Sequence, residues 1–219
     1  MMEPKILYQD AFLVIAVKPA GTLSQPDKTG DAAMTDILSE RIGKTVLPVH
    51  RLDRAVGGVM VFALTKEAAG KLGGILGTNA FQKEYLTVVD GIPAEKEGTL
   101  EDYLLHDARR NMTSVVSAKT KDAKAASLSY TLLETHEKAS LLRVLLHTGR
   151  THQIRVQFSS RAMPILGDGR YGSRERHPVA LWSYRLSFSH PMTKKRLTFQ
   201  AIPDMTTPWD MFSAYDNLK

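Results

Sequence analysis

One short stretch restricts the fold of this chain more than any other. A charged loop, His-Arg-Leu-Asp-Arg at residues 50–54, leads through Gly57 and Gly58 into the apolar run 59–63. A short apolar run bounded by turn residues is typical of a strand buried in a core. The chain must therefore hold a carboxylate and two arginines at the mouth of its hydrophobic core.

Burial at that place would normally disfavour the charged form of Asp53, whereas a contacting arginine stabilises it. A partly desolvated carboxylate that stays ionised is what a nucleophilic aspartate requires. An isolated Arg-x-Asp-Arg is more often a surface salt bridge, so the rest of the sequence has to decide between these two interpretations.

Composition narrows the class of protein. With 219 residues, 43% hydrophobic and 24% charged, the chain is long and apolar enough for one sizeable core or two small subdomains. It has no cysteine, which excludes disulfides, thiolate nucleophiles and cysteine-based metal sites. No apolar leader or membrane-length apolar run is present, so we expect a cytoplasmic protein. The net charge of +6 weakly favours a polyanionic partner.

Hydrophobic patterning predicts many strands and few helices. We expect strands at 6–8, 12–17, 59–63, 81–90, 127–134, 140–146, 180–188 and 197–201. Helices are expected after Asp31, Thr65 and Thr151 as N-caps, with a short one after Thr207. The basic stretch 106–126 is interpreted as a long loop or exposed hairpin. This order indicates an α+β fold with a largely antiparallel, mixed central sheet and flanking helices, in one domain over 1–219.

Three further segments carry chemistry. Tyr85 lies in Lys-Glu-Tyr at the start of a strand, where a core tyrosine is the ordinary interpretation. The stretch 147–156, His-Thr-Gly-Arg-Thr-His-Gln-Ile-Arg-Val, places many donors at an expected helix start, which favours an anion such as phosphate. The stretch 163–172 contains Gly-x-Gly-x-x-Gly, but it follows a helix and precedes a loop, so we reject a dinucleotide site.

Taken together, these segments resemble the RluA-type family of RNA pseudouridine synthases. The resemblance rests on His-Arg-Leu-Asp-Arg, Lys-x-Tyr, Thr-Gly-Arg-Thr-His-Gln-Ile-Arg and Pro-Ile-x-Gly-Asp-x-x-Tyr-Gly, and it extends over nearly the whole chain. It implies a pseudouridine synthase-like catalytic domain without a separate S4-type RNA-binding domain. It also implies that Asp53 is the catalytic aspartate, that Arg155 pairs with it, and that Tyr85 stacks near the target base and takes part in acid–base work.

The resemblance further implies how RNA is bound. Arg51 would support the space left by a flipped uridine, and Ile154 would bound the uracil together with Tyr85. The remaining candidate substrate-binding residues are His50, Arg150, Thr151, His152 and Gln153. Candidate phosphate contacts are Lys18, Arg54, Arg150, the loop 109–124 and residues 194–196. The expected substrate is uridine in ribosomal or transfer RNA, modified by a monomer that needs no metal and no cofactor.

The chain departs from the family pattern at four positions, one of which is Val17, which precedes Lys-Pro where asparagine is usual. Val56 and Gly57 stand where Thr or Ser followed by Ser is common, and Trp182 stands where histidine is frequent. One alternative is therefore a non-catalytic RNA-binding protein that keeps the fold. Another is an unrelated hydrolase with an aspartate nucleophile, although the chain offers no carboxylate cluster for its metal. The histidines at 50, 147 and 152 lack a recognised zinc spacing.

Overall fold

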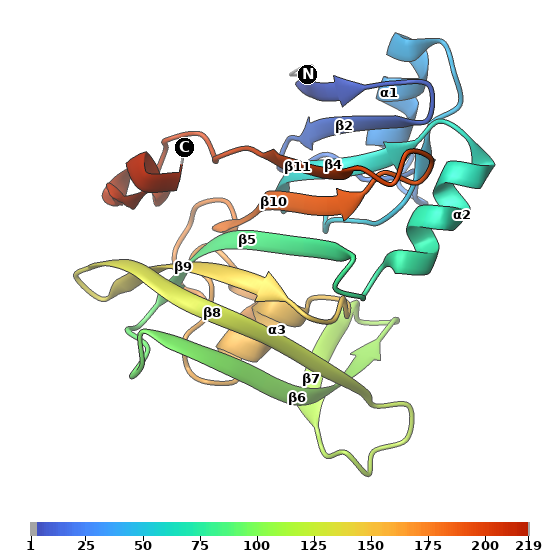
Figure 1. Ribbon diagram of the computed structural model, residues 1–219. Coiled ribbons are helices and arrows are strands. Elements are labelled where there is room, and N and C mark those ends of the chain that lie inside the picture. The colour runs from blue at the N-terminus through green and yellow to red at the C-terminus, as the bar shows by residue number, and fades with distance from the viewer. Residues whose placement is uncertain (1–3, 219) are drawn as a thin grey trace. The chain divides into compact units, whose positions relative to one another are not determined.

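The computed structural model describes residues 4–218, which form two compact units (Figure 1). Unit 1 comprises the described residues up to Lys83 together with Trp182–Pro203. Unit 2 comprises Glu84–Leu181 and the described residues from Asp204 onward. Both combine a sheet with helices, so the expected α+β class is confirmed. The expectation of one catalytic domain over 1–219 stays a prediction.

The sheet of unit 1 is built around β4 (Gly57–Ala63), which is buried along its whole length as its apolar sequence predicts. Its antiparallel neighbours are β2 (Leu13–Lys18) and the short β3 (Leu47–Pro48), and its parallel neighbour is β10 (Leu181–Ser189). The outer strands β1 (Ile6–Gln9) and β11 (Arg196–Gln200) pair with β2 and β10 respectively. One parallel pair among antiparallel ones makes the sheet mixed, as expected.

Two helices flank this sheet. The helix α2 (Lys66–Ile75) begins as predicted, because the Thr65 side chain accepts a hydrogen bond from the Ala68 backbone N–H. The helix α1 (Met34–Ile42) ends at Gly43, whose φ of 70° is the left-handed conformation that favours glycine. Asp31 was the wrong cap for α1, since Ala33 occupies the N-cap position and the Asp31 carboxylate pairs with Arg54 instead.

The core of unit 1 joins β2, β4 and β10 to α2. Its aromatic centre is Phe81, whose ring stacks on Phe188 with centroids 5.3 Å apart. Ala68 and Leu72 bring the apolar side of α2 into the same cluster. Removal of this apolar surface from water stabilises β4, the strand that directly follows the residue 50–54 loop.

The strands of unit 2 follow the order β5, β9, β8, β6, β7, and β5 enters this unit at Glu84. The bounds are β5 (Phe81–Asp90), β9 (Ala139–Leu146), β8 (Lys124–His136), β6 (Glu97–Asp107) and β7 (Met112–Val116). The basic stretch 106–126 contains the β6–β7 turn, β7 and the connection to β8, which agrees with the expected exposed hairpin. The strand β6 was missed because it buries little besides Leu100 and Leu104, four residues apart.

The helix α3 (Gln153–Ser159) packs against β6 and β7 (Figure 1). Val156 on this helix meets Leu104, Ala126 and Tyr171 in a small core cluster. Short 3₁₀ turns occur at Gly169–Tyr171, Trp209–Met211 and Ala214–Leu218. The last two correspond to the short terminal helix expected after Thr207.

Candidate active site

The aspartate loop, residues 50–54, is held on both sides of Asp53 by a second segment, residues 18–24. On one side, the Ser24 hydroxyl donates to the Leu52 carbonyl (2.8 Å) and accepts from the Leu52 N–H (3.0 Å). On the other, the Gly21 N–H donates to the Arg54 carbonyl at 2.7 Å. The backbone is therefore fixed before and after the half-buried Asp53.

Lys18 strengthens the second of these attachments. Its side chain is fully buried, and its ammonium donates to the carbonyls of Pro19 (3.0 Å), Thr22 (2.7 Å) and Arg54 (3.2 Å). Burial lowers the pKa of Lys18 to about 8, although the nearby Asp53 carboxylate acts in the opposite direction. The expected phosphate contact at Lys18 is wrong, because a buried ammonium committed to three carbonyls is not presented to RNA.

Replacing Ser24 with alanine tests the first attachment. The change removes both hydrogen bonds to Leu52, so we expect kcat for uridine isomerisation to fall about tenfold while the Kd for RNA stays within about twofold. Leaving the buried Leu52 backbone groups unpaired should lower the free energy of unfolding by about 1–3 kcal/mol. Ser187→Ala is the control, since its hydroxyl bonds to the Thr198 hydroxyl on an exposed side, away from the aspartate loop. Unchanged kcat in Ser24→Ala would contradict a role for this bond.

Lys18 predicts a pH dependence of stability. The folded chain releases the Lys18 proton near pH 8, whereas the unfolded chain holds it up to about 10.5. The unfolded state thus binds more protons between these values, and folding gains up to about 1.4 kcal/mol per pH unit as pH rises. Urea unfolding at about pH 8 and about pH 10 should show the wild type gaining stability relative to Lys18→Met. A difference that is constant with pH would contradict this.

The other residues of the aspartate loop differ in how far they are exposed to solvent. His50 is half-buried, and its Nε2 accepts from the Val61 N–H in β4 at 3.3 Å. Burial, assisted by the Lys83 charge, lowers the pKa of His50 to about 3, so its ring is neutral. Arg51 is exposed. Arg54 donates from Nη1 to the Asp31 carboxylate (2.6 Å) and from Nε to the Gly21 carbonyl (3.0 Å).

In unit 2, the Arg155 guanidinium lies in a cradle formed by Asp168 and Tyr171. Its Nε and Nη2 donate to the two carboxylate oxygens of Asp168 at 2.6 and 2.8 Å, and both side chains are buried. The Tyr171 ring lies 4.9 Å from the guanidinium carbon, in cation–π contact. A bidentate pair over an aromatic ring fixes the plane of the guanidinium as well as its position. These contacts orient Arg155 within unit 2.

The Gln153 side chain fixes the loop before α3 through three hydrogen bonds. The Gln153 amide oxygen accepts from the Thr148 hydroxyl (2.8 Å) and the Arg150 N–H (3.0 Å), and its nitrogen donates to the Ser127 carbonyl (3.1 Å). The expected N-cap at Thr151 is wrong, since His152 takes that position with φ 54°.

The candidate substrate-binding residues of unit 2 include exposed and buried side chains. Arg150 and Thr151 are exposed, whereas His152, Gln153 and Ile154 are buried. The His152 Nδ1 atom lies 2.8 Å from the Tyr171 hydroxyl, which ties the start of α3 to the cradle. Tyr85 is buried in β5. The structure thus describes His50, Arg51 and Asp53 in unit 1 and the other candidates in unit 2.

Sequence reasoning missed the supporting residues Ser24, Asp168 and Tyr171. Asp168 and Tyr171 lie in the Gly-Asp-x-x-Tyr part of the stretch 163–172, for which the sequence pattern predicts no contact with Arg155. The available signal was a carboxylate in a turn with an arginine-bearing helix shortly before it. No pattern in the sequence indicated Ser24.

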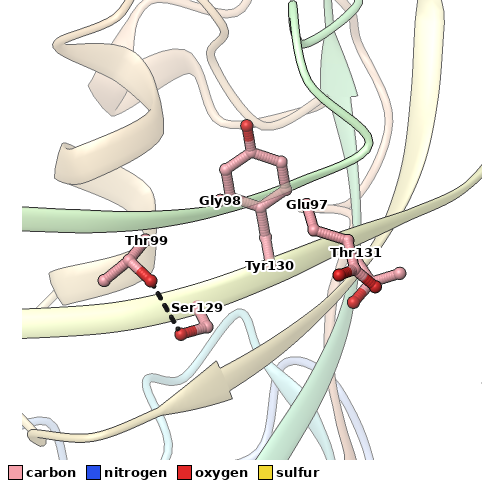
Figure 2. Close-up of a pocket in the computed structure, with 6 residues that line it drawn as sticks. All are labelled: Glu97, Gly98, Thr99, Ser129, Tyr130 and Thr131. Atoms are coloured by element: carbon pink, nitrogen blue, oxygen red, sulfur yellow. Dashed lines mark hydrogen bonds between the residues drawn. The ribbon is translucent and has the colours of Figure 1, made fainter.

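One pocket, of about 330 Å³, lies on unit 2 between β6 and β8 (Figure 2). Thr99 and Ser129 bond across it at 3.1 Å, and the Tyr130 ring covers Gly98. Its lining contains none of the candidate site residues. Among residues 4–218 there is no cluster of three or more His, Asp or Glu that could hold a metal ion. No helix in the same range is long and apolar enough to span a membrane.

Comparison with known proteins identifies the family. The family model for RNA pseudouridylate synthase matches residues 12–160, which include Asp53, Tyr85 and Arg155. The chain belongs to the RNA pseudouridylate synthase family. Membership makes it an isomerase, as the sequence predicted. The resemblance to the RluA-type enzymes is confirmed.

Curated relatives match the chain over nearly their full length. The tRNA pseudouridine synthase C of Haemophilus influenzae is 34% identical, covering 90% of this chain and 92% of the relative. The dual-specificity RNA pseudouridine synthase RluA of Escherichia coli K12 is 35% identical, covering 91% and 93%. Among solved structures, human RNA pseudouridylate synthase domain containing 1 has a TM-score of 0.81 at 20% identity, covering 98% of this chain and 92% of that one. This last likeness supports the pseudouridine synthase fold.

Proposed function

We propose that this chain isomerises specific uridines in ribosomal RNA, transfer RNA or both, with Asp53 as the catalytic carboxylate. The names of its relatives support these substrates, since one acts on tRNA and another has dual specificity. The observation that carries the proposal is the aspartate loop, fixed by backbone hydrogen bonds before and after Asp53. Such preorganisation suits a carboxylate that must meet a reacting atom in one geometry.

In the proposed reaction, the bond from ribose C1′ to uracil N1 breaks, the base turns, and C5 bonds to C1′. The C5 hydrogen leaves as a proton, and N1 takes up a proton. Asp53 can act by attacking C1′, by attacking the base, or by assisting loss of the C2′ proton. All three routes need an ionised carboxylate. The target base leaves the helical stack, at a cost of a few kcal/mol.

Tyr85 and Arg155 complete the proposed catalytic group. The pairing of Arg155 with Asp53 stays a prediction of the family resemblance, as does stacking of Tyr85 near the uracil. Two of the five guanidinium N–H donors of Arg155 bond to Asp168, which supports a role for Arg155 as a rigidly oriented cation.

The proposed RNA contacts combine exposed and buried residues. Arg51, Arg150 and Thr151 are exposed and suited to direct contact, whereas His50, His152, Gln153 and Ile154 would shape the site from within. The β6–β7 turn, the β7–β8 connection and the start of β8 add further exposed cations, namely Arg109, Arg110, Lys119, Lys121 and Lys124. Cations of this kind bind the phosphate backbone irrespective of sequence and release counterions. In this proposal the enzyme is a cytoplasmic monomer that works without metal or cofactor.

Mapping pseudouridines in RNA from cells that lack this protein tests the proposal. We expect at least one pseudouridine to be missing from rRNA or tRNA and to return when the wild-type chain is supplied. The purified chain should release tritium from [5-³H]uridine-labelled RNA that contains that site. An unchanged map, with no tritium release, would instead favour a non-catalytic RNA-binding protein.

A further inference from the structure

Gly57, the first residue of β4, is enclosed by Trp182. A Cβ atom at position 57 would stand 2.3 Å from Cζ3 and 2.8 Å from Cε3 of the indole. It would also lie 3.1 Å from the backbone nitrogen of Ala20. Carbon atoms that are not bonded do not approach so closely, so position 57 accepts no side chain while the indole stays in place.

Trp182 is itself held in this position. Its backbone pairs with Gly57 in the parallel β4–β10 register, and its indole N–H donates to the Ala201 carbonyl at 2.7 Å. The next residue pair is equally close, because a Cβ on Gly58 would lie 2.2 Å from the Ser183 carbonyl oxygen. The start of β4 is thus pressed against a fixed part of β10.

Two connections lead from Gly57 to Asp53. The first is the chain itself, in which the Val56 N–H donates to the Asp53 carbonyl at 2.9 Å and closes a tight turn just before Gly57. The second is Ala20, which belongs to the 18–24 segment that fixes the aspartate loop. An added side chain at position 57 would therefore push against both supports of Asp53.

We infer that Gly57 and Trp182 are a matched pair of positioning residues, in which the tryptophan requires the glycine and together they set the place of Asp53. This inference rests on the proposed catalytic role of Asp53. Neither residue needs to touch the substrate.

A double-mutant cycle tests the pair. We would measure kcat, the Kd for RNA and Tm for the wild type, Gly57→Ala, Trp182→Ala and the double variant. In the wild-type background, Gly57→Ala should lower kcat at least about tenfold with Kd within about twofold. In the Trp182→Ala background, the same change should alter kcat less than about threefold, because the two closest contacts of the added Cβ, both with the indole, are then removed.

Gly70→Ala provides the matched control for an added Cβ. Gly70 lies in α2 of the same unit, and nothing lies within 4 Å of the added atom. This variant should keep the wild-type kcat. Trp182→Ala alone should reduce kcat less than Gly57→Ala does.

Several outcomes would overturn the inference. One is an equal loss of kcat from Gly57→Ala in both backgrounds. Another is a lower Tm with unchanged kcat in the folded protein, which would indicate a purely structural role. If Gly57→Ala alone does not fold, recovery of folded, active protein in the double variant supports the pair, and no recovery refutes it. The wild type and Asp53→Asn in the same assay separate this result from failure of the proposed function, which would leave the wild type without tritium release.

Discussion

Asp53→Asn is expected to abolish isomerisation, lowering kcat by at least about 10³-fold while changing the Kd for RNA less than about threefold. Asparagine keeps the shape of aspartate but lacks the negative charge that every proposed route requires. The loop should keep its conformation, because the hydrogen bonds to the backbone of Leu52 and Arg54 are unaffected by the substitution. Single-turnover tritium release from [5-³H]uridine-labelled RNA measures the effect.

Asp36→Asn is the control for this experiment. Asp36 is an exposed carboxylate in the first turn of α1, in the same unit as Asp53, so its loss should leave kcat unchanged. Comparable turnover by Asp53→Asn and the wild type would refute the catalytic assignment. Loss of RNA binding together with activity would show that the change disturbs the site as a whole.

Asp168→Ala should have the largest effect on stability. The substitution leaves the buried guanidinium of Arg155 without its bidentate partner, and breaking a buried ion pair in this way costs about 3–5 kcal/mol of unfolding free energy. It also removes the contact that orients Arg155, so kcat should fall by about 10²-fold. Urea unfolding and tritium release below the unfolding transition measure the two effects separately.

The matched comparison is Glu67→Ala, which breaks the exposed Lys71–Glu67 pair on α2. Exposed pairs at this spacing contribute only about 0.3–0.5 kcal/mol, and this site has no proposed part in catalysis. Equal destabilisation by the two substitutions would contradict a special role for the Asp168 pair. Asp168→Ala that retains full kcat would show that Arg155 does not need this orientation.

The sequence predicts the strands of this protein better than its helix starts. The apolar run 59–63 and the alternation around residues 81–90 both fold as strands, because their periodicity expresses burial directly. Asp31 and Thr151 were expected to cap helices but do not. Whether such a side chain caps a helix depends on its other partners. The Asp31 carboxylate forms an ion pair with Arg54, 23 residues further along the chain.

The candidate site was likewise predicted only in part. Motif resemblance indicates the residues expected to carry chemistry, such as Asp53 and Arg155. The residues that hold them in place could not be predicted, since Ser24 meets Leu52 only through the tertiary fold. Lys18 was expected at the surface because lysine is seldom fully buried, and only the structure reveals its three carbonyl partners.

The attachment of the aspartate loop to the 18–24 segment also has a dynamic consequence. Lys18 is the last residue of β2, which runs beside β4 in an unbroken ladder from Leu13–Ala63 to Lys18–Gly58. The loop cannot open locally without fraying the ends of these two central strands. Amide hydrogens at Gly21, Leu52 and Val56 should therefore exchange with solvent as slowly as those of the strands. The entropy of ordering this loop is then lost once, when the chain folds, and not again at each turnover.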